Sequence, residues 1–407
     1  MSVCKKKEPS ELQFRNGSSD DVVYSPTSSD SNKKSSSGQS IEDCEPKELK
    51  SKFAPKMIAK SLLSSSFERL CNLESKAFQQ LDPYDPLTAE LTHGYGFSYR
   101  AGRVFRCGTF LDFSQGIFET GEIDDTVRLK HANFCKDRLC PMCNWRRGLK
   151  IYGNVSQIMN VIGDKYQFLF LTLTVPNCEA EELNSTIDTM NLAFYRMKRS
   201  KRFKSVVKGF HRVLEVTINQ DNESYHPHFH VILAVEKNYL KSRDYITHSE
   251  WLQMWRDATK NQYIQMVNIK VIKPKLKDGK LYEKSLHNAV AEVSKYAVKA
   301  SDFLGKFDKK GNLIQSFDEE IIDRRVFTLA SALSGRQLSV FGGVFSDTQK
   351  ALKLDDAETG DLVHVQDDKF NPYVAELIVR FKWSYGISRY EKVSCNIFRK
   401  EQCKDVS

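Results

Sequence analysis

One stretch decides the fold: Tyr225-His226-Pro227-His228-Phe229-His230-Val231-Ile232-Leu233. Three histidines alternate along it ahead of an apolar run, and the side chains of a β-strand point alternately to its two faces. The three imidazoles therefore share one face, while Phe229, Val231 and Leu233 share the other. Imidazoles gathered on one face of a strand that anchors in a core favour a divalent metal site. The alternative is a surface strand with incidental histidines.

A second strand and a turn precede this stretch. Residues 212–218 alternate between apolar and polar side chains, and residues 219–224 are turn formers, so the two runs predict a β-hairpin. If the turn is centred at residues 221–222, Glu215 lies directly across from His228, with about 5 Å between their Cβ atoms. A carboxylate and two imidazoles would then meet at one point. Taken alone, Glu215 would be an ordinary solvated strand residue.

A third alternating run covers residues 167–176, with leucines on one face and Thr172 and Thr174 on the other. We expect the two threonines to be structural hydroxyls on the site-facing side. A mostly helical crossover, from about residue 180 to 208, links this run to the hairpin. Three strands with one apolar face each indicate an antiparallel sheet backed by helices, which is the α+β class.

A helical pattern covers residues 285–302. Its expected buried stripe is Leu286, Val290, Val293, Ala297, Ala300 and Leu304. Glu292, Tyr296 and Lys299 would lie about a quarter turn away from that stripe. A phenol flanked by a cation and a carboxylate at the rim of a core suits a nucleophile that must meet a bulky substrate. The alternative is a half-buried tyrosine with two solvated neighbours.

Residues 107–143 contain five possible zinc ligands, four cysteines and one histidine. Cys140 and Cys143 have the two-residue spacing of a metal site and are the firm ligands of a predicted four-ligand zinc site. Three residues compete for the two remaining places: Cys135, Cys107 and His131. A disulfide scaffold is the alternative, but the chain shows no signal-peptide pattern and its other cysteines are scattered.

Four motifs together resemble those of the rolling-circle replication initiators of small bacterial plasmids, which are members of the HUH endonuclease superfamily. The motifs are the strand at residues 170–177, the pair His228 and His230 around Phe229, Tyr296 followed by Lys299, and the cysteine segment at residues 134–147. One branch of these initiators also has a Glu four residues before the tyrosine, which is the place of Glu292. The resemblance covers roughly residues 100–345.

The resemblance implies an HUH endonuclease fold, in which helices pack on the faces of an antiparallel sheet of about five strands. It also implies an enzyme that binds the double-strand origin of a plasmid and nicks one strand at an extruded single-stranded site. The products are a 5′-phosphotyrosine and a free 3′-hydroxyl primer, and a second cleavage ends the round. A host helicase and a host DNA polymerase would be its partners, in the bacterial cytoplasm.

The resemblance assigns roles to single residues. Tyr296 would be the nucleophile, Lys299 would stabilise the phenolate or the phosphate, and Glu292 would activate the water for the second cut. The expected ligands of a Mn²⁺ or Mg²⁺ ion are His228, His230 and Glu215, with His226 as a third imidazole ligand or a neighbour of the ligands.

Charge is unevenly spread in this chain of 407 residues with a formal net charge of +9. Basic runs are usually solvated faces, but in a DNA-cleaving protein they favour contacts to the DNA backbone. The residues expected to make such contacts are Arg146 and Arg147 beside the cysteines, and Lys198, Arg199, Lys201 and Arg202 in the crossover. No apolar run approaches the length of a membrane span, so we expect no membrane partner.

Four regions follow from these patterns. Residues 1–52 are Ser-rich and charged, which predicts a disordered tail. Residues 53–160 hold an amphipathic helix and the cysteine cluster, and residues 161–310 would be the catalytic nuclease domain. Residues 311–407 include a strand flanked by glycines, an acidic patch and a further alternating strand, and their role is open.

Three other functions are alternatives to the interpretation as an initiator. A transposase or a relaxase of the same superfamily would use the same kind of residues. A hydrolytic metallonuclease would activate water at the histidine site and would not need Tyr296. A zinc-containing DNA-binding regulator would explain the cysteines and the charge, but it leaves the histidine strand without a purpose.

Overall fold

The computed structural model describes residues 47–80, 96–272, 276–277, 280–281, 284–295, 297–365 and 373–399. The chain divides into two compact units, residues 1–45 and 46–407, and every feature below belongs to the second. The expected tail lies outside the described residues up to residue 46, and so does Tyr296. Within the described residues, no helix combines the length and the apolar character that crossing a membrane requires.

The helices are α1 (Lys47–Gln80), α3 (Phe97–Arg106), α4 (Pro141–Ile162), α5 (Leu183–Arg199), α6 (Lys201–Val206), α7 (His248–Thr259), α8 (Lys284–Val293), α9 (Ala300–Phe303), α10 (Glu319–Leu333) and α11 (Val344–Ala351), with the 3-10 turn η2 (Tyr239–Lys241). The strands are β1 (Phe110–Ile117), β2 (Arg128–Ala132), β3 (Tyr166–Thr174), β4 (Val207–Ile218), β5 (Tyr225–Glu236), β6 (Val267–Ile272), β7 (Leu276–Lys277), β8 (Lys280–Leu281), β9 (Gly305–Phe307), β10 (Leu313–Ser316), β11 (Ser339–Gly343), β12 (Ala375–Ser384) and β13 (Arg389–Arg399).

The larger sheet has five strands in the order β11-β4-β5-β3-β6, and all its neighbours are antiparallel. The predicted hairpin forms its centre, because β4 and β5 pair along their whole length. The predicted third strand, β3, lies on the other side of β5. The α+β class, the antiparallel sheet and the number of strands expected from the sequence are therefore confirmed.

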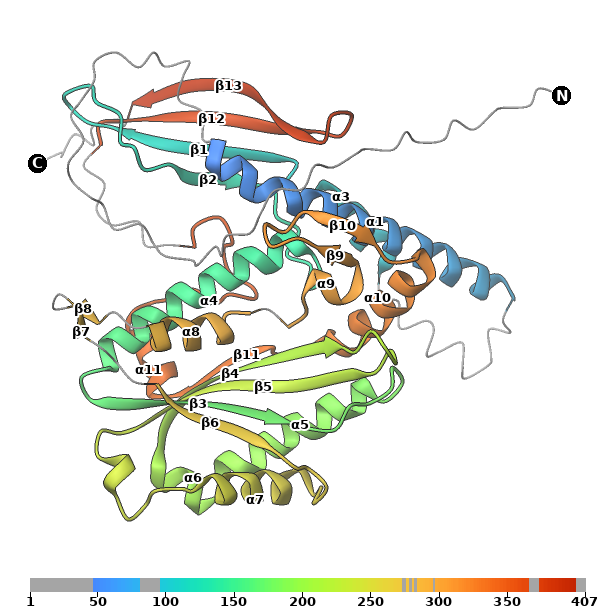
Figure 1. Cartoon of the computed structure of the whole chain (residues 1–407). Coiled ribbons are helices and arrows are strands. Elements are labelled where there is room, and N and C mark those ends of the chain that lie inside the picture. Colours follow the sequence, from blue (N-terminus) through green and yellow to red (C-terminus); the bar gives the residue numbers. More distant parts are fainter. Residues whose placement is uncertain are drawn as a thin grey trace, which may run out of the picture. The chain divides into compact units, whose positions relative to one another are not determined.

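Helices cover both faces of this sheet (Figure 1). On one face, Phe229 packs edge-on against Phe194 of α5 and Trp255 of α7, with ring centroids 6.0 Å and 6.4 Å apart. On the other face, Ile232 lies in a core cluster with side chains of α4, α8 and α11. Each large apolar side chain buried in this way contributes about 1.5–3 kcal/mol. A one-residue slip of β5 would exchange its two faces, so the core also fixes which way the histidines point.

The smaller sheet combines strands from the early part of the chain, β1 and β2, with the last two strands, β12 and β13. Its order is β13-β12-β1-β2, and β1 pairs antiparallel with β12 from Phe110↔Lys382 to Ile117↔Ala375. Helices α1 and α3 pack together, and Phe53 of α1 contacts Phe113 of β1 at a centroid distance of 5.9 Å. Residues 311–407 thus supply β11 to the larger sheet and β12 and β13 to the smaller one.

The helix expected over residues 285–302 is interrupted. Helix α8 ends at Val293, and the chain becomes helical again only at Ala300. Between them, the carbonyl of Ala297 accepts a hydrogen bond of 2.7 Å from the backbone N–H of Val216 in β4. That buried N–H lies beyond the end of β11 and needs an acceptor, and satisfying it outweighs the helical propensity of the segment. The expectation that Glu292, Tyr296 and Lys299 share one face of a continuous helix was therefore wrong.

Candidate metal centres

The hairpin brings three possible metal ligands together on the face covered by α4 and α8. Glu215 pairs in register with His228, as predicted from the turn. His230 Nε2 lies 2.9 Å from Glu215 Oε2, and His228 Nε2 lies 3.4 Å from the same oxygen. The two Nε2 atoms are 3.2 Å apart. One oxygen and two nitrogens thus converge on one point, as the donor atoms of a divalent ion do.

Neighbouring groups hold both imidazoles with Nε2 toward this point. His228 Nδ1 lies 3.1 Å from the backbone carbonyl of His226, and His230 Nδ1 lies 3.4 Å from the hydroxyl of Thr172. A second hydrogen bond of this kind fixes the ring orientation of a metal-binding histidine. The ring of His226 itself stacks on that of His228, 5.1 Å away, but its nitrogens are not among the converging atoms. This favours His226 as a neighbour of the ligands.

Lys299 reaches the same carboxylate from outside the sheet. Its Nζ lies 2.8 Å from Glu215 Oε1, the oxygen that turns away from the histidines. Burial alone would raise the pKa of Glu215, but hydrogen bonds from His228, His230 and Lys299 outweigh it and hold that pKa well below its usual range. Glu215 is therefore an anion, which is the form a metal ligand needs.

Glu292 is not among the converging ligand atoms. It is half-buried near the end of α8 and forms an ion pair with Lys295. Tyr296, the expected nucleophile, lies outside the described residues, but its successor Ala297 is bonded to Val216, the residue next to Glu215.

Sequence reasoning missed Asp302, which ends the helical pattern quoted for this segment. Within the described part of the chain, its buried Oδ2 has no hydrogen-bond partner, and its Oδ1 accepts from the hydroxyl of Ser301 at 3.3 Å. Burial raises the pKa of Asp302 to about 6, although nearby Lys299 opposes the shift. The only sequence signal was an acid close to an apolar stripe.

We expect Asp302→Asn to stabilise the protein at neutral pH. A raised carboxyl pKa means that wild-type stability falls as the pH rises from about 4 to about 6 and is then constant. The amide does not ionise, so the variant should match the wild type near pH 4 and exceed it by about 2–3 kcal/mol above pH 7. Urea unfolding at both pH values measures this, and an equal stability difference at both would contradict it.

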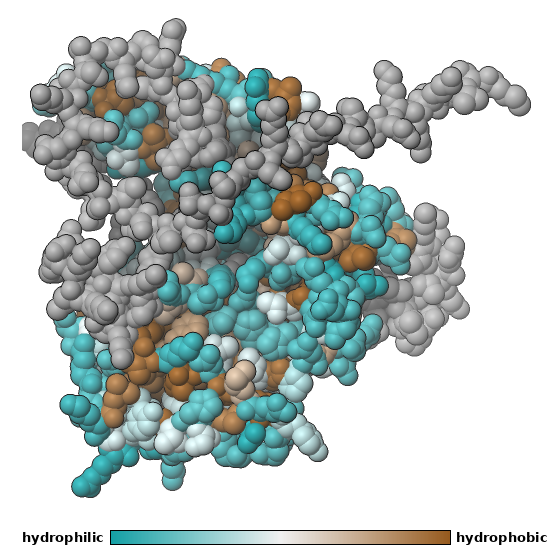
Figure 2. Space-filling model, in the orientation of Figure 1, coloured by the Kyte–Doolittle hydropathy of each residue, from teal (hydrophilic) through white to brown (hydrophobic). Residues whose placement is uncertain are grey.

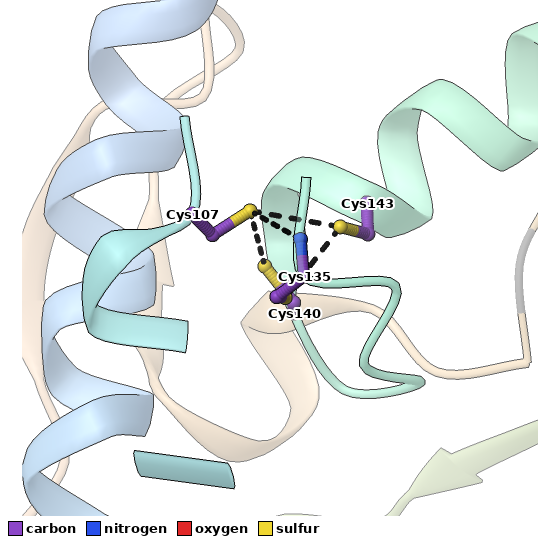
Figure 3. Close-up of side chains that lie close together, drawn as sticks. All are labelled: Cys107, Cys135, Cys140 and Cys143. Atoms are coloured by element: carbon purple, nitrogen blue, oxygen red, sulfur yellow. Dashed lines mark hydrogen bonds between the residues drawn. The ribbon is translucent and has the colours of Figure 1, made fainter. Parts of the chain in front are cut away.

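Four cysteines form the second cluster (Figure 3). They are Cys107 after α3, Cys135 after β2, and Cys140 and Cys143 at the start of α4. All four are buried, and the sulfur–sulfur distances are 3.6 Å, 3.6 Å and 3.7 Å for the pairs 107–143, 135–143 and 107–140. A disulfide bond would need about 2.05 Å. Four sulfurs placed tetrahedrally about 2.3 Å from a zinc ion lie about 3.8 Å apart, so the cluster fits zinc.

The surroundings of the sulfurs fit thiolates. Backbone N–H groups of Cys135, Lys136 and Asp137 donate to sulfurs of the cluster at 3.4 Å, 3.2 Å and 3.4 Å. The buried ammonium of Lys60, which donates to the carbonyl of Val104 at 3.2 Å, adds a positive charge nearby. Such donors offset the charge of −2 that one zinc ion and four thiolates would carry.

The structure settles which residues meet at this cluster. Cys107 and Cys135 take the two places that the sequence left open. His131 does not join them, because it is largely exposed and its Nδ1 lies 3.6 Å from Asp112.

Cys140→Ser should release a bound zinc ion and lower the free energy of unfolding by about 3 kcal/mol or more, since a structural metal contributes folding free energy. The matched control is Cys395→Ser on β13, which lies outside the cluster. Elemental analysis and thermal unfolding give the readout. Wild-type protein without zinc or iron would refute the assignment.

The basic residues after the cysteines have a structural role, which corrects the expectation that they contact DNA. Arg146 donates to the carbonyls of Leu362 and Val363 at 2.8 Å and 2.6 Å. Arg147 is 1% exposed and donates to the carbonyl of Asp137 at 3.0 Å. Burial lowers the pKa of Arg146 to about 10. These buried guanidinium groups donate to carbonyls of the chain itself and do not reach solvent where DNA phosphate would lie.

The other expected DNA contacts lie where β4 starts, at the end of the larger sheet away from Glu215. The group consists of Lys198 and Arg199 at the end of α5 and Lys201 and Arg202 at the start of α6. Arg199 and Lys201 are exposed, and the other two are half-buried. These side chains belong to the helices on the face away from Glu215.

Comparison with known proteins identifies the family. A family model described as "Replication protein" (Rep_1) matches residues 126–391. A "Protein rep" of Bacillus amyloliquefaciens is 36% identical over 316 residues, which cover 75% of this chain and 88% of the relative. A second, from Bacillus sp, is 37% identical over 292 residues, covering 70% and 90%. A third, from Streptococcus pneumoniae, is 36% identical over 271 residues, covering 65% and 76%.

The matched region begins just before β2 and ends inside β13, so it contains the hairpin, Lys299 and three of the four clustered cysteines. No solved structure matches the chain. The chain belongs to the Rep_1 family of replication proteins, which confirms the resemblance to plasmid replication initiators drawn from its motifs.

Proposed function

We propose that this protein initiates rolling-circle replication by nicking one strand of its plasmid origin and remaining attached to the new 5′ end. The observation that carries the proposal is the convergence of Glu215, His228 and His230, with Lys299 on the same carboxylate. A replication protein that only bound DNA would not need this buried ionic cluster, because taking charges out of water is costly.

Glu215, His228 and His230 would hold a Mn²⁺ or Mg²⁺ ion, since a carboxylate beside two imidazoles suits such ions. When bound, the ion polarises the scissile phosphate and offsets its negative charge. Lys299, which lies 2.8 Å from Glu215, would hold the unshared carboxylate oxygen and add positive charge near the phosphate.

Tyr296 would supply the nucleophile. The hydrogen bond from Val216 to Ala297 supports this assignment, because it anchors the chain next to Tyr296 beside the metal ligands. The tyrosine oxygen would attack phosphorus as the bond to the 3′ oxygen breaks. The phenolic proton leaves the tyrosine, and the leaving oxygen gains one to become the 3′-hydroxyl primer. The phosphotyrosine conserves the ester for the later rejoining step.

Glu292 would act in the terminating cleavage, as general base for a water. In the described structure its carboxylate forms an ion pair with Lys295, and a carboxylate is a group that can accept the proton of an attacking water. We expect Glu292→Gln to retain the first nick but to fail at termination, so that multimeric single strands accumulate. Gel analysis of replication products measures this, and unit-length circles in normal yield would leave Glu292 with the ion-pair role alone.

The cysteine cluster would hold a structural zinc ion that fixes the start of α4 against the segment after α3. The nicked DNA would then pass to a host helicase and a host DNA polymerase in the bacterial cytoplasm. A transposase or relaxase-like strand transferase is the nearest alternative, and family membership favours the initiator. A hydrolytic metallonuclease would leave no protein on the DNA.

The test is to incubate the purified chain with Mn²⁺ and a supercoiled plasmid that carries the region around its own gene. The proposal expects nicked circles with protein attached to the 5′ end. Nicked circles free of protein would indicate hydrolysis, and uncut plasmid would refute nicking.

A further inference from the structure

One end of the larger sheet carries an excess of positive charge. We call it the basic end and define it as residues 198–208 and 236–250, the connections that flank the start of β4 and the end of β5. It holds nine basic side chains, namely Lys198, Arg199, Lys201, Arg202, Lys204, Lys208, Lys237, Lys241 and Arg243. It holds three acidic ones, Glu236, Asp244 and Glu250. The whole chain has a net charge of only +9, so this surface carries much of the imbalance.

The three acids are already engaged by two of the basic residues. Arg202 lies 3.2 Å from Glu250 and 3.9 Å from Asp244, and Lys208 lies 3.5 Å from Glu236. In the described part of the chain, the other seven basic side chains form no ion pair with a carboxylate. Lys204, Lys241 and Arg243 are exposed. In Figure 2 hydrophilic side chains line the lower-left edge, beside hydrophobic ones, where Figure 1 draws this end of the sheet.

The basic end is far from the metal centre. Glu215 follows Lys208 by seven residues along β4, which corresponds to about 23 Å at about 3.3 Å per residue. Helices α5 and α7 also cover the sheet face opposite to Glu215, as the contacts of Phe229 show. A DNA segment bound at the basic end is therefore not the one being cut. About seven base pairs of duplex, at about 3.4 Å each, span the separation along the strand.

We propose that the basic end binds the DNA duplex that flanks the nick, through its phosphates and without reading its sequence. The proposal rests on the proposed nicking function and adds a second, separable DNA site. Surfaces for single strands combine basic side chains with open aromatic platforms. Here Tyr195 is 46% exposed, but the cationic groups of Lys198 and Arg199 lie over its ring, at 5.3 Å and 5.2 Å from its centroid. Tyr245 packs against Tyr239 at 5.4 Å. Because both rings already pack against neighbouring side chains while Lys204, Lys241 and Arg243 are exposed, phosphate contact is the chemistry that this surface favours.

The experiment compares two triple variants of the full chain. The test variant is Lys204→Gln with Lys241→Gln and Arg243→Gln. The control variant, Lys306→Gln with Lys310→Gln and Lys392→Gln, removes the same charge from exposed positions on other elements. Binding to a labelled duplex of about 30 base pairs of unrelated sequence, and to a single strand of thymidines of similar length, is measured with EDTA over a range of salt concentrations.

We expect the duplex affinity of the test variant to fall by about tenfold or more, and its salt slope by about 2.7, since each lost phosphate contact removes about 0.9. Single-strand binding and the control variant should match the wild type. An unchanged slope, an equal effect in the control, or an equal loss for the single strand would overturn the proposal. The proposed nicking function is measured separately, as cleavage of a short single strand with Mn²⁺. Failure of the nicking proposal can therefore be distinguished from failure of the duplex-binding proposal.

Discussion

Replacing Tyr296 with Phe should abolish nicking and the covalent protein–DNA adduct while leaving DNA binding intact. Phenylalanine keeps the ring and removes only the attacking oxygen, so we expect the rate of strand cleavage to fall by about three orders of magnitude or more. The measurement is a denaturing gel with a 5′-labelled or 3′-labelled oligonucleotide that spans the nick site, together with a binding assay on the same DNA.

The matched control is Tyr263→Phe, which removes the same oxygen from an exposed tyrosine after α7. It should cut like the wild type. An adduct of undiminished yield in the Tyr296 variant would mean that another residue attacks the phosphate.

Replacing His230 with Ala should have the second-largest effect. His230 is 9% exposed and its Nε2 lies 2.9 Å from Glu215 Oε2, closer than that of His228, so its loss would leave a bound metal ion with two ligands from the protein. We expect metal-dependent cleavage to fall by about a hundredfold or more, while DNA binding persists. Glu215→Ala should weaken metal affinity by about tenfold or more.

His226→Ala tests the same centre from the other side. The histidine lies on the same strand and its ring stacks on that of His228, but its hydrogen bond to His228 comes from its backbone carbonyl, and its ring nitrogens are not among the converging atoms. The variant keeps that carbonyl, so we expect a much smaller loss than for His230→Ala. Equal losses in the two variants would indicate that His226 is a ligand. Wild-type cleavage that is unchanged by EDTA would contradict the role of the metal ion.

The hairpin and its site could be predicted because their geometry is local. The turn between β4 and β5 fixes the register, and a strand period of two then places Glu215 opposite His228. Cys140 and Cys143, three residues apart in the chain, were also expected to lie together from their local spacing, and their sulfurs do meet in the cluster.

The remaining features depend on contacts between distant parts of the chain. Cys107 joins the cluster from 28 residues before Cys135, a separation that carries no spacing signal. Arg146 looks like a DNA contact in sequence, but it is buried by carbonyls from residues 362 and 363. The end of α8 at Val293 follows from a hydrogen bond between Ala297 and a strand about 80 residues earlier, which no helical periodicity reveals.

The most direct test of the nicking mechanism is to identify the residue that carries DNA. A short oligonucleotide that contains the nick site is cleaved with Mn²⁺, the covalent product is digested with protease and nuclease, and the peptides are examined by mass spectrometry. We expect one modified peptide, with a nucleotide joined through its 5′-phosphate to Tyr296. A nucleotide on another residue, or cleaved DNA with a free 5′-phosphate and no modified peptide, would contradict the account.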